Sequence, residues 1–230
     1  ELIDPKDLNI VGGRALGKTT TIIARRTLRI NKSMPGSYVA FVGDYYSNLL
    51  SNTVPSMLKG WEDNGLVEGK DFVVNERPPA HFDKPYKRPI TYKHTVSFST
   101  GTFYKLASMD VVSSVAGDSY QHVVGDEVKY LDKKKLDKLL PAKRGERLSF
   151  EHSPYYLGTT FTTDMPNELM GSEYGWILDM ENNMDVEQIK IILYASLTVN
   201  DIKLAMTKAF IKKDANEFAK QKRNYERWNQ

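Results

Sequence analysis

Residues 12–19 read Gly-Gly-Arg-Ala-Leu-Gly-Lys-Thr and carry the most informative pattern in the chain. It fits the pattern G-x-x-x-x-G-K-S/T, in which a glycine-rich loop leads into a helix. The apolar run Leu8–Val11 before it predicts a buried strand, and Lys18–Ile30 after it predicts the helix. Glycines let backbone N–H groups approach a triphosphate, and the free amides at a helix start favour anions. The stretch therefore predicts a phosphate-binding loop; a glycine-rich turn capping an ordinary helix is the alternative.

Different residues of this loop are expected to contact different parts of a bound Mg²⁺-triphosphate. Lys18 would reach the β- and γ-phosphates, and the Thr19 hydroxyl would coordinate Mg²⁺. Arg14 either contacts the γ-phosphate, which makes it a catalytic candidate with Lys18, or covers the loop while solvated. The candidate nucleotide-binding residues come from the loop and the first helical turn: Gly12, Gly13, Arg14, Ala15, Leu16, Gly17, Lys18, Thr19 and Thr20.

A second stretch, residues 122–127, reads His-Val-Val-Gly-Asp-Glu. It predicts a buried strand over Gln121–Val124 that ends in adjacent acids. A carboxylate at the carboxyl end of a parallel strand points into the ligand crevice. Asp126 is therefore expected to hold the metal, directly or through water. Glu127 would act as the general base that activates the attacking water, whereas a solvated turn is the alternative.

A third signal follows a strand predicted at Tyr155–Leu157. Gly158, Thr159 and Thr160 come directly after it. Hydroxyl groups at a strand end can sense a γ-phosphate, and a polar turn with a helix cap is the alternative.

The remaining pattern indicates alternating strands and helices, and therefore an α/β fold with a largely parallel sheet. An interruption is expected at Pro55 in the second helix. The further strands are predicted at Tyr38–Val42, Thr95–Phe98, Thr102–Leu106 (as a hairpin with the strand before it) and Gln188–Tyr194. The further helices are predicted at Asn48–Asn64, Leu131–Leu140 and Asp201–Trp228, the last with Ile211, Phe218 and Tyr225 on one face.

Composition narrows the class of protein. The chain has 230 residues and a net charge of +3, and its lack of cysteine leaves no disulfide or thiolate metal site. No apolar run approaches the ~18 residues of a membrane span, and the four histidines show no metal-ligand spacing. The basic runs Lys133–Lys135 and Lys143-Arg144 are interpreted as solvated faces, with DNA contact as the alternative. Because the chain begins at Glu1, we expect a fragment or a processed product.

Together these motifs resemble the large terminase subunits of tailed bacteriophages. Gly-Gly-Arg-x-x-Gly-Lys-Thr is similar to their phosphate loop, Val-Val-Gly-Asp-Glu to their second motif, and Tyr-Leu-Gly-Thr-Thr to their coupling motif. Residues 113–117, Ser-Ser-Val-Ala-Gly, also resemble the family. The resemblance covers residues 8–165 and implies a three-layer, RecA-like P-loop NTPase. We therefore expect an ATPase core at 1–195 and a helical lid or linker at 196–230.

This resemblance implies Mg²⁺-dependent ATP hydrolysis that drives double-stranded DNA into a viral capsid. It implies Gly158, Thr159 and Thr160 as coupling residues. The implied partners are DNA, a portal protein, a small terminase subunit and further copies in a ring, with no membrane. The implied location is the host cytoplasm and, transiently, the procapsid. Two departures from the family pattern are expected: the usual nuclease domain is absent from this chain, which ends at Gln230, and only seven residues precede Leu8, where an adenine-binding segment often lies. No arginine stands near Gly117, so the candidates for an arginine finger are Arg88, Arg144 and Arg147.

Two other functions remain open at this point. One is a helicase-like or remodelling ATPase that acts on another polymer. The other is a non-hydrolysing nucleotide-binding module. A guanine-specific switch is disfavoured because the nearest base-reading string, residues 31–34, lacks the required aspartate. DNA-stimulated ATP turnover would separate the ATPases from the binding module.

Overall fold

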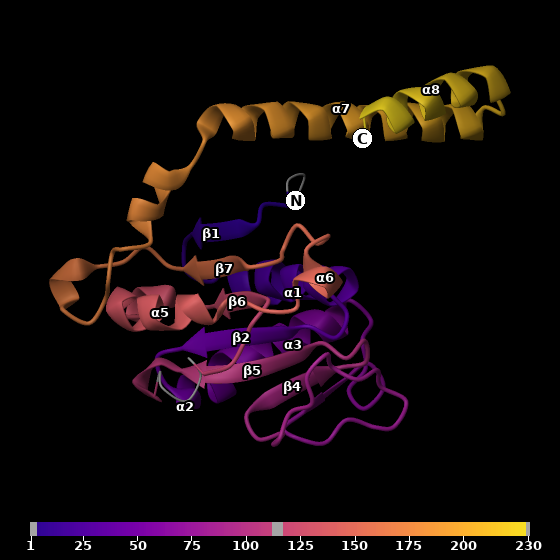
Figure 1. Cartoon of the computed structure of the whole chain (residues 1–230). Coiled ribbons are helices and arrows are strands. Elements are labelled where there is room, and N and C mark those ends of the chain that lie inside the picture. Colours follow the sequence, from indigo (N-terminus) through magenta and orange to yellow (C-terminus); the bar gives the residue numbers. More distant parts are fainter. Residues whose placement is uncertain (1–3, 112–116, 229–230) are drawn as a thin grey trace. The chain divides into compact units, whose positions relative to one another are not determined.

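The computed structural model describes residues 4–111 and 117–228. By its internal contacts the chain divides into two compact units, one formed by residues 5–180 and the other containing the segment from residue 181 onward. The first unit is built around a sheet and the second is helical (Figure 1).

The sheet has seven strands in the order β1-β7-β6-β2-β5-β4-β3. Neighbouring strands from β1 to β5 pair in parallel, whereas β4 and β3 add by antiparallel pairing. The predicted α/β class with a mostly parallel sheet is therefore confirmed, as is the hairpin of β4 and β5. The strands are β1 Asp7–Val11, β2 Tyr38–Gly43, β3 Phe72–Val74, β4 Thr95–Phe98, β5 Phe103–Ser108, β6 His122–Gly125 and β7 Gly158–Thr163.

Strand register brings four chain segments to one edge of the sheet. Val11 of β1 lies opposite Thr163 of β7, and Gly125 of β6 lies opposite both Phe161 of β7 and Val42 of β2. Because these strands are parallel, their carboxyl ends meet at the same edge, where ligands bind in open α/β sheets. The phosphate loop, the acid pair and the residues after β7 and β2 all emerge there.

Helices cover both faces of the sheet and give the predicted three layers (Figure 1). Side chains of β2 alternate between the faces, because successive residues of a strand point to opposite sides. Val39 and Phe41 pack in a core with α1 (Ala24–Ser33) and α3 (Val54–Asp63). Ala40 and Val42 pack on the other face with α5 (Lys133–Leu139).

A glycine sets how closely α3 packs against the helix that follows the phosphate loop. That helix begins with the π-helical segment η1, Lys18–Ile23, and continues as α1. A Cβ atom at Gly60 would lie 2.2 Å from the Thr20 carbonyl oxygen, so only glycine allows this approach. The Trp61 indole then donates to the Thr27 hydroxyl at 2.9 Å. Packing therefore fixes the helix that carries Lys18 and Thr19.

The predicted interruption at Pro55 takes the form of a π-helical turn. Helix α2 (Tyr46–Asn48) runs through η2 (Leu49–Thr53) directly into α3, with Pro55 in its first turn. Proline has no backbone N–H, and a widened turn accommodates this loss without ending the helix. The other short helices are η3 Met109–Val111, η4 Val128–Tyr130, η5 Leu140–Ala142, α6 Arg147–Phe150, η6 Glu168–Met170 and η7 Leu178–Asn183.

Two predicted strands are wrong. Tyr155–Leu157 forms the turn before β7, in which Leu157 adopts a left-handed conformation with φ 56°. The segment Gln188–Tyr194 lies inside helix α7 (Val186–Ile211), whose first turn is capped by the Asp185 side chain. A short apolar run fits a strand or a helix equally well, and the cap decides for the helix here. Strand β3 was not predicted.

The second unit is a helical hairpin rather than one long tail. Helix α7 ends at Ile211 and α8 spans Ala215–Trp228, with Lys213 in the left-handed region at φ 57°. Ring contacts between Tyr194 and Trp228 and between Phe210 and Phe218 join the two helices in antiparallel fashion. Ile211 is therefore not on one helix with Phe218, and the predicted common face does not exist. The predicted helical extension is present, and the proposed boundary at 195/196 falls within α7. No helix among residues 4–111 and 117–228 is long and apolar enough to cross a membrane.

Candidate active site

The phosphate loop leaves β1 and turns back into η1 at the carboxyl edge of the sheet. The Gly12 N–H donates to the Thr163 carbonyl at 3.1 Å, which extends the β1–β7 pairing by one residue. Gly17 caps η1 in the left-handed region, with φ 67° and ψ 29°, and Ala15 also has φ 62°. A Cβ atom at Gly12 or Gly13 would meet only ordinary contacts at 3.5–3.8 Å within the protein. Glycine at these two positions therefore leaves backbone free for a ligand rather than for packing.

Lys18 begins η1 and is buried, with 7% of its side chain exposed. Its ammonium group donates to the Gly13 carbonyl at 3.0 Å and to the Gly12 carbonyl at 3.4 Å. It also forms a very short ion pair with Asp164, the residue directly after β7. The Lys18 ammonium group is thus held in place by two carbonyls of the phosphate loop and by Asp164 at the end of β7.

Asp126 is the centre of the hydrogen-bond network at this edge. Its Oδ2 atom accepts from the Thr19 hydroxyl at 2.5 Å, and its Oδ1 atom accepts from the Thr162 hydroxyl at 2.5 Å and from the Glu127 N–H at 3.0 Å. The aspartate is buried. It therefore ties together the first turn of η1, the end of β7 and the end of β6.

Glu127 is held in a strained conformation beside Asp126. Its backbone lies in the left-handed region, with φ 49° and ψ 43°, which is costly for a residue with a Cβ atom. Its Oε2 atom is buried and has no hydrogen-bond partner among the described residues. Burial, followed by the charges of Asp126 and Asp164, raises the pKa of Glu127 above its ordinary value. A carboxylate that has one unpartnered oxygen and a raised pKa is suited to accept a proton from a water molecule.

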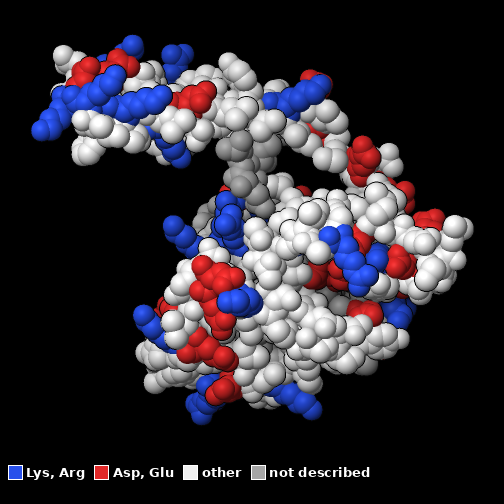
Figure 2. Space-filling view, turned by 180° about the vertical axis from the view of Figure 1, so that it is seen from behind, with Lys and Arg blue, Asp and Glu red and all other residues white. Residues whose placement is uncertain are grey.

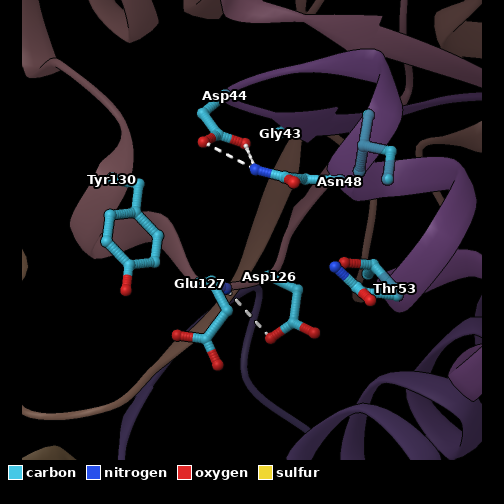
Figure 3. Close-up of a pocket in the computed structure, with 9 residues that line it drawn as sticks. Gly43, Asp44, Asn48, Thr53, Asp126, Glu127 and Tyr130 are labelled. Carbon is cyan, nitrogen blue, oxygen red and sulfur yellow. Dashed lines mark hydrogen bonds between the residues drawn. The ribbon is translucent and has the colours of Figure 1, made fainter.

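A cavity of about 310 Å³ opens beside the acid pair. Figure 3 shows the carboxylates of Asp126 and Glu127 side by side, with Asp44 above them and Tyr130 to one side of the cavity. Asp44 accepts two hydrogen bonds of 3.0 Å from the Asn48 amide and so presents an ordered polar wall. The cavity is lined by Gly43, Asp44, Asn48, Leu49, Asn52, Thr53, Asp126, Glu127 and Tyr130.

The sequence interpretation missed the residues contributed by β2 and α2. A signal for them exists, because Val-Gly-Asp occurs both at residues 42–44 and at residues 124–126. Each copy follows a buried strand, and the parallel pairing of Val42 with Gly125 places both aspartates at the same edge.

The three predicted coupling residues lie at the opposite end of β7 from the phosphate loop. The Thr159 N–H and hydroxyl both donate to Asp7 at 2.8 Å, at the start of β1. Thr160 contacts the buried His122 at 2.9 Å and accepts from Arg26 at 3.3 Å. The Tyr155–Leu157 segment is a turn, and β7 begins at Gly158, directly after the point where the predicted strand was expected to end. Among the described residues, no hydrogen bond or ion pair joins Gly158, Thr159 or Thr160 to the phosphate loop.

Thr162 and Asp164 occupy the position that we assigned to the coupling residues. They lie at the carboxyl end of β7, where Thr162 contacts Asp126 and Asp164 contacts Lys18. The sequence interpretation missed both, although a second Thr-Thr pair at residues 162–163 was visible three positions later.

The arginine candidates do not lie together in the structure. Arg14 is exposed on the phosphate loop, as are Ala15 and Leu16, whereas the Thr20 hydroxyl bonds back to the Gly17 carbonyl at 3.3 Å. The Arg144 N–H donates to the Tyr120 carbonyl just before β6, and Arg147 pairs with Glu151. Arg88 follows Lys87, whose carbonyl accepts from Tyr38 at the start of β2. Arg88 and Arg144 thus lie by the amino ends of the strands. Residues 113–116, which carried part of the resemblance, lie outside the described residues.

The oxygen donors at the carboxyl edge fit Mg²⁺. The Thr19 hydroxyl and the Asp126 carboxylate lie within 2.5 Å of each other. Mg²⁺ prefers oxygen ligands and takes one or two from the protein when phosphates and waters supply the rest. No cluster of three or more acidic or histidine ligands exists among the described residues, so an all-protein metal cage is not formed there.

Comparisons with known proteins give the following similarities. No family model matches the chain, and no curated protein matches it. Among solved structures, the large terminase of a thermophilic bacteriophage is 12% identical with a TM-score of 0.48, over 72% of this chain and 35% of that chain. A complex of that terminase with ADP is 12% identical with a TM-score of 0.43, over 69% and 33% of the two chains. The ATPase domain of the Thermus phage P74-26 large terminase is 14% identical with a TM-score of 0.42, over 72% and 61%. The chain thus spans less than two thirds of each of these structures.

Proposed function

We propose that this chain is a Mg²⁺-dependent ATPase of the P-loop class. The observation that carries the proposal is the meeting of Lys18, Thr19, Asp126 and Glu127 at one sheet edge. Thr19 and Asp126 are hydrogen bonded at 2.5 Å, and Glu127 follows Asp126 directly. A cation, a hydroxyl and two carboxylates with different environments are the groups that hydrolysis of a phosphoanhydride requires.

Each group has a distinct task in this proposal. The loop amides and Lys18 bind the β- and γ-phosphates, and the exposed Arg14 adds positive charge at the γ-phosphate. The Glu127 carboxylate accepts a proton from water while the water oxygen attacks the γ-phosphorus and ADP leaves. Thr19 and Asp126 hold Mg²⁺, which when bound neutralises charge on the phosphate oxygens. The cavity beside Glu127 provides space for the attacking water.

Two substitutions test this assignment. Glu127→Gln is expected to keep ATP binding and to lower kcat by about 100-fold or more, because it removes a general base. Lys18→Ala is expected to weaken binding of ATP instead. The measurements are steady-state phosphate release and equilibrium binding of a fluorescent ATP analogue. Parent-like hydrolysis by Glu127→Gln would show that another group serves as the base.

The motifs further support a role in packaging DNA. In this proposal the chain is the ATPase part of a terminase large subunit and moves double-stranded DNA into a bacteriophage capsid. It acts in the host cytoplasm as a ring of copies on the procapsid, with a portal protein and a small terminase subunit as partners. The observation that carries this step is the motif resemblance over residues 8–165. The coupling role in this proposal falls to Thr162 and Asp164, which contact the nucleotide-site residues directly.

The helical hairpin is the part of the chain that suits a DNA backbone. Residues 201–228 contain eight Lys and Arg against four Asp and Glu, a net charge of +4, whereas the whole chain carries +3. Figure 2 shows lysine and arginine side chains gathered on this hairpin. Exposed cations that form no ion pair with any described residue are Lys208, Lys212, Lys213, Lys222, Arg223 and Arg227. Unpaired surface cations bind phosphates by releasing counterions.

Duplex DNA is the reagent that tests the packaging proposal. ATP turnover is expected to increase when duplex DNA is added at low ionic strength, and Glu127→Gln should abolish the stimulated rate. Stimulation by single-stranded nucleic acid but not by duplex would favour the helicase-like alternative. An ATPase rate that no nucleic acid changes would contradict the DNA-translocating role while leaving the ATPase assignment intact.

A further inference from the structure

All three N–H bonds of the Lys18 ammonium group are occupied within the protein. Two go to the Gly12 and Gly13 carbonyls and the third to the Asp164 carboxylate. A lysine ammonium has only three donors. The residue that is expected to bind a phosphate therefore has no donor left for it in this arrangement.

Asp164 is the member of this set that resembles a phosphate. A carboxylate and a phosphate are both anionic oxygen acceptors, and each forms a strong charge-assisted hydrogen bond with an ammonium group. The pair is shielded from water, with 7% of the Lys18 side chain and 17% of the Asp164 side chain exposed. Exchange of one anion for the other keeps Lys18 paired with an anionic oxygen, and the two carbonyl contacts can remain.

The surroundings hold Asp164 in place. The residues before it are anchored, because the Thr163 hydroxyl accepts from the Lys129 N–H at 3.3 Å and the Thr163 carbonyl accepts from the Gly12 N–H at 3.1 Å. Asp164 itself is the first residue after β7 and enters an irregular segment. The backbone that leads into Asp164 is thus anchored beside the phosphate loop by the strand that also carries Thr162.

We propose that Asp164 is an internal competitor of the nucleotide, which occupies Lys18 in the nucleotide-free protein and yields it to the β- and γ-phosphates. This proposal rests on the proposed nucleotide site. Asp164 then opposes binding of any phosphate ligand that Lys18 contacts. When a nucleotide binds, Asp164 loses its bond to Lys18 and its carboxylate stays beside Asp126 and Glu127. The end of β7 therefore responds to whether the phosphate loop holds a nucleotide.

A double-mutant cycle tests the proposal. Affinities for a non-hydrolysable ATP analogue and for ADP are measured by titration calorimetry. Asp164→Asn is expected to bind the ATP analogue about tenfold more tightly than the parent, since one charge-assisted bond no longer competes. In the Lys18→Ala background the same substitution is expected to change affinity by less than about twofold, because the competed group is gone.

Matched variants separate competition from general electrostatics. Asp110→Asn removes another carboxylate from the same edge, where Asp110 follows β5 and pairs with Lys135 rather than with Lys18, and it should leave the affinity within about twofold. Asp164→Glu retains the anion and should stay close to the parent. If Asp164→Asn melts well below the parent, Asp164→Ser replaces it in the cycle.

Several results would overturn the inference. These are equal tightening by Asp164→Asn and Asp110→Asn, unchanged tightening in the Lys18→Ala background, or weaker binding by Asp164→Asn. Failure of the nucleotide site itself appears differently. In that case the parent and Lys18→Ala bind nucleotide equally poorly, whatever stands at position 164.

Discussion

At the scale of single residues, Glu127 combines a strained backbone with an unpaired, buried carboxylate oxygen. Burial and the neighbouring charges of Asp126 and Asp164 raise its pKa. A general base must be ionised, so kcat/KM for ATP should fall on acidification at a pH above the ~4.3 of an ordinary glutamate. Asp164→Asn should move this acid limb to lower pH. If the acid limb of the kcat/KM profile stays in place in Asp164→Asn, the charge of Asp164 does not contribute to the raised pKa of Glu127.

The same carboxylate should reduce the stability of the folded protein. Because the pKa of Glu127 is raised in the folded state, folding favours the protonated carboxyl group. The free energy of unfolding therefore falls as the pH rises through that pKa. Glu127→Gln, which cannot ionise, should therefore increase the free energy of unfolding at neutral pH. The gain should fade below the ordinary glutamate range, where both states are protonated. Urea denaturation at several pH values measures it, and an equal gain at all pH values would point to packing instead.

At the scale of elements, β6, β7 and α1 are joined by a buried polar network around His122. The Tyr155 carbonyl can only accept, so His122 Nδ1 donates to it at 2.8 Å and Nε2 accepts from Thr160 at 2.9 Å. Burial lowers the pKa of His122 to about 3, although the bond to Tyr155 opposes the change. This network lies at the amino ends of the strands and secures the sheet that positions the site.

Acid should destabilise the folded protein through the buried His122. Between the ordinary histidine pKa of ~6.5 and the lowered value, the unfolded chain binds a proton that the folded chain excludes. His122 alone should then reduce the free energy of unfolding by up to about 1.4 kcal/mol per pH unit as the pH falls. His122→Gln should flatten this dependence, and the matched change at the exposed His81 should not. Equal slopes in both variants would show that other groups control acid unfolding.

At the scale of the whole molecule, positive charge is concentrated on the helical hairpin. Each phosphate contact lowers the slope of log affinity against log salt by ~0.9. Replacing Lys212, Lys213, Lys222 and Arg223 with Gln should weaken duplex binding and flatten the salt dependence, measured by fluorescence anisotropy. The control replaces the same number of lysines around α5, where Lys133 pairs with Asp137 and Lys135 pairs with Asp110. If the α5 variant loses as much affinity, the hairpin is not the preferred surface.

Local chemistry in the sequence was enough to predict the fold class, which the structure confirms, and to propose the principal residues of the candidate site. The spacing of Gly12, Gly17 and Lys18 predicts a loop because only certain backbone conformations and donors suit a phosphate. The buried run before Asp126 predicts a strand because both faces of a parallel sheet are covered. These signals depend on neighbouring residues, so they can be recognised without knowing the tertiary structure.

Only the tertiary structure decided where β7 begins and which residues its carboxyl end brings to the site. A Thr-Thr pair occurs at both residues 159–160 and 162–163, and the choice between them depends on pairing with β1 and β6. Asp44 and Asp164 likewise join the site through strand order, since they are distant in sequence from Lys18 and Glu127. Gln188–Tyr194 became helical because its cap and its pairing with α8 outweighed the β-branched composition. Contacts between distant segments set the start of β7 and brought Asp44 and Asp164 to the site, and periodicity within one segment does not contain this information.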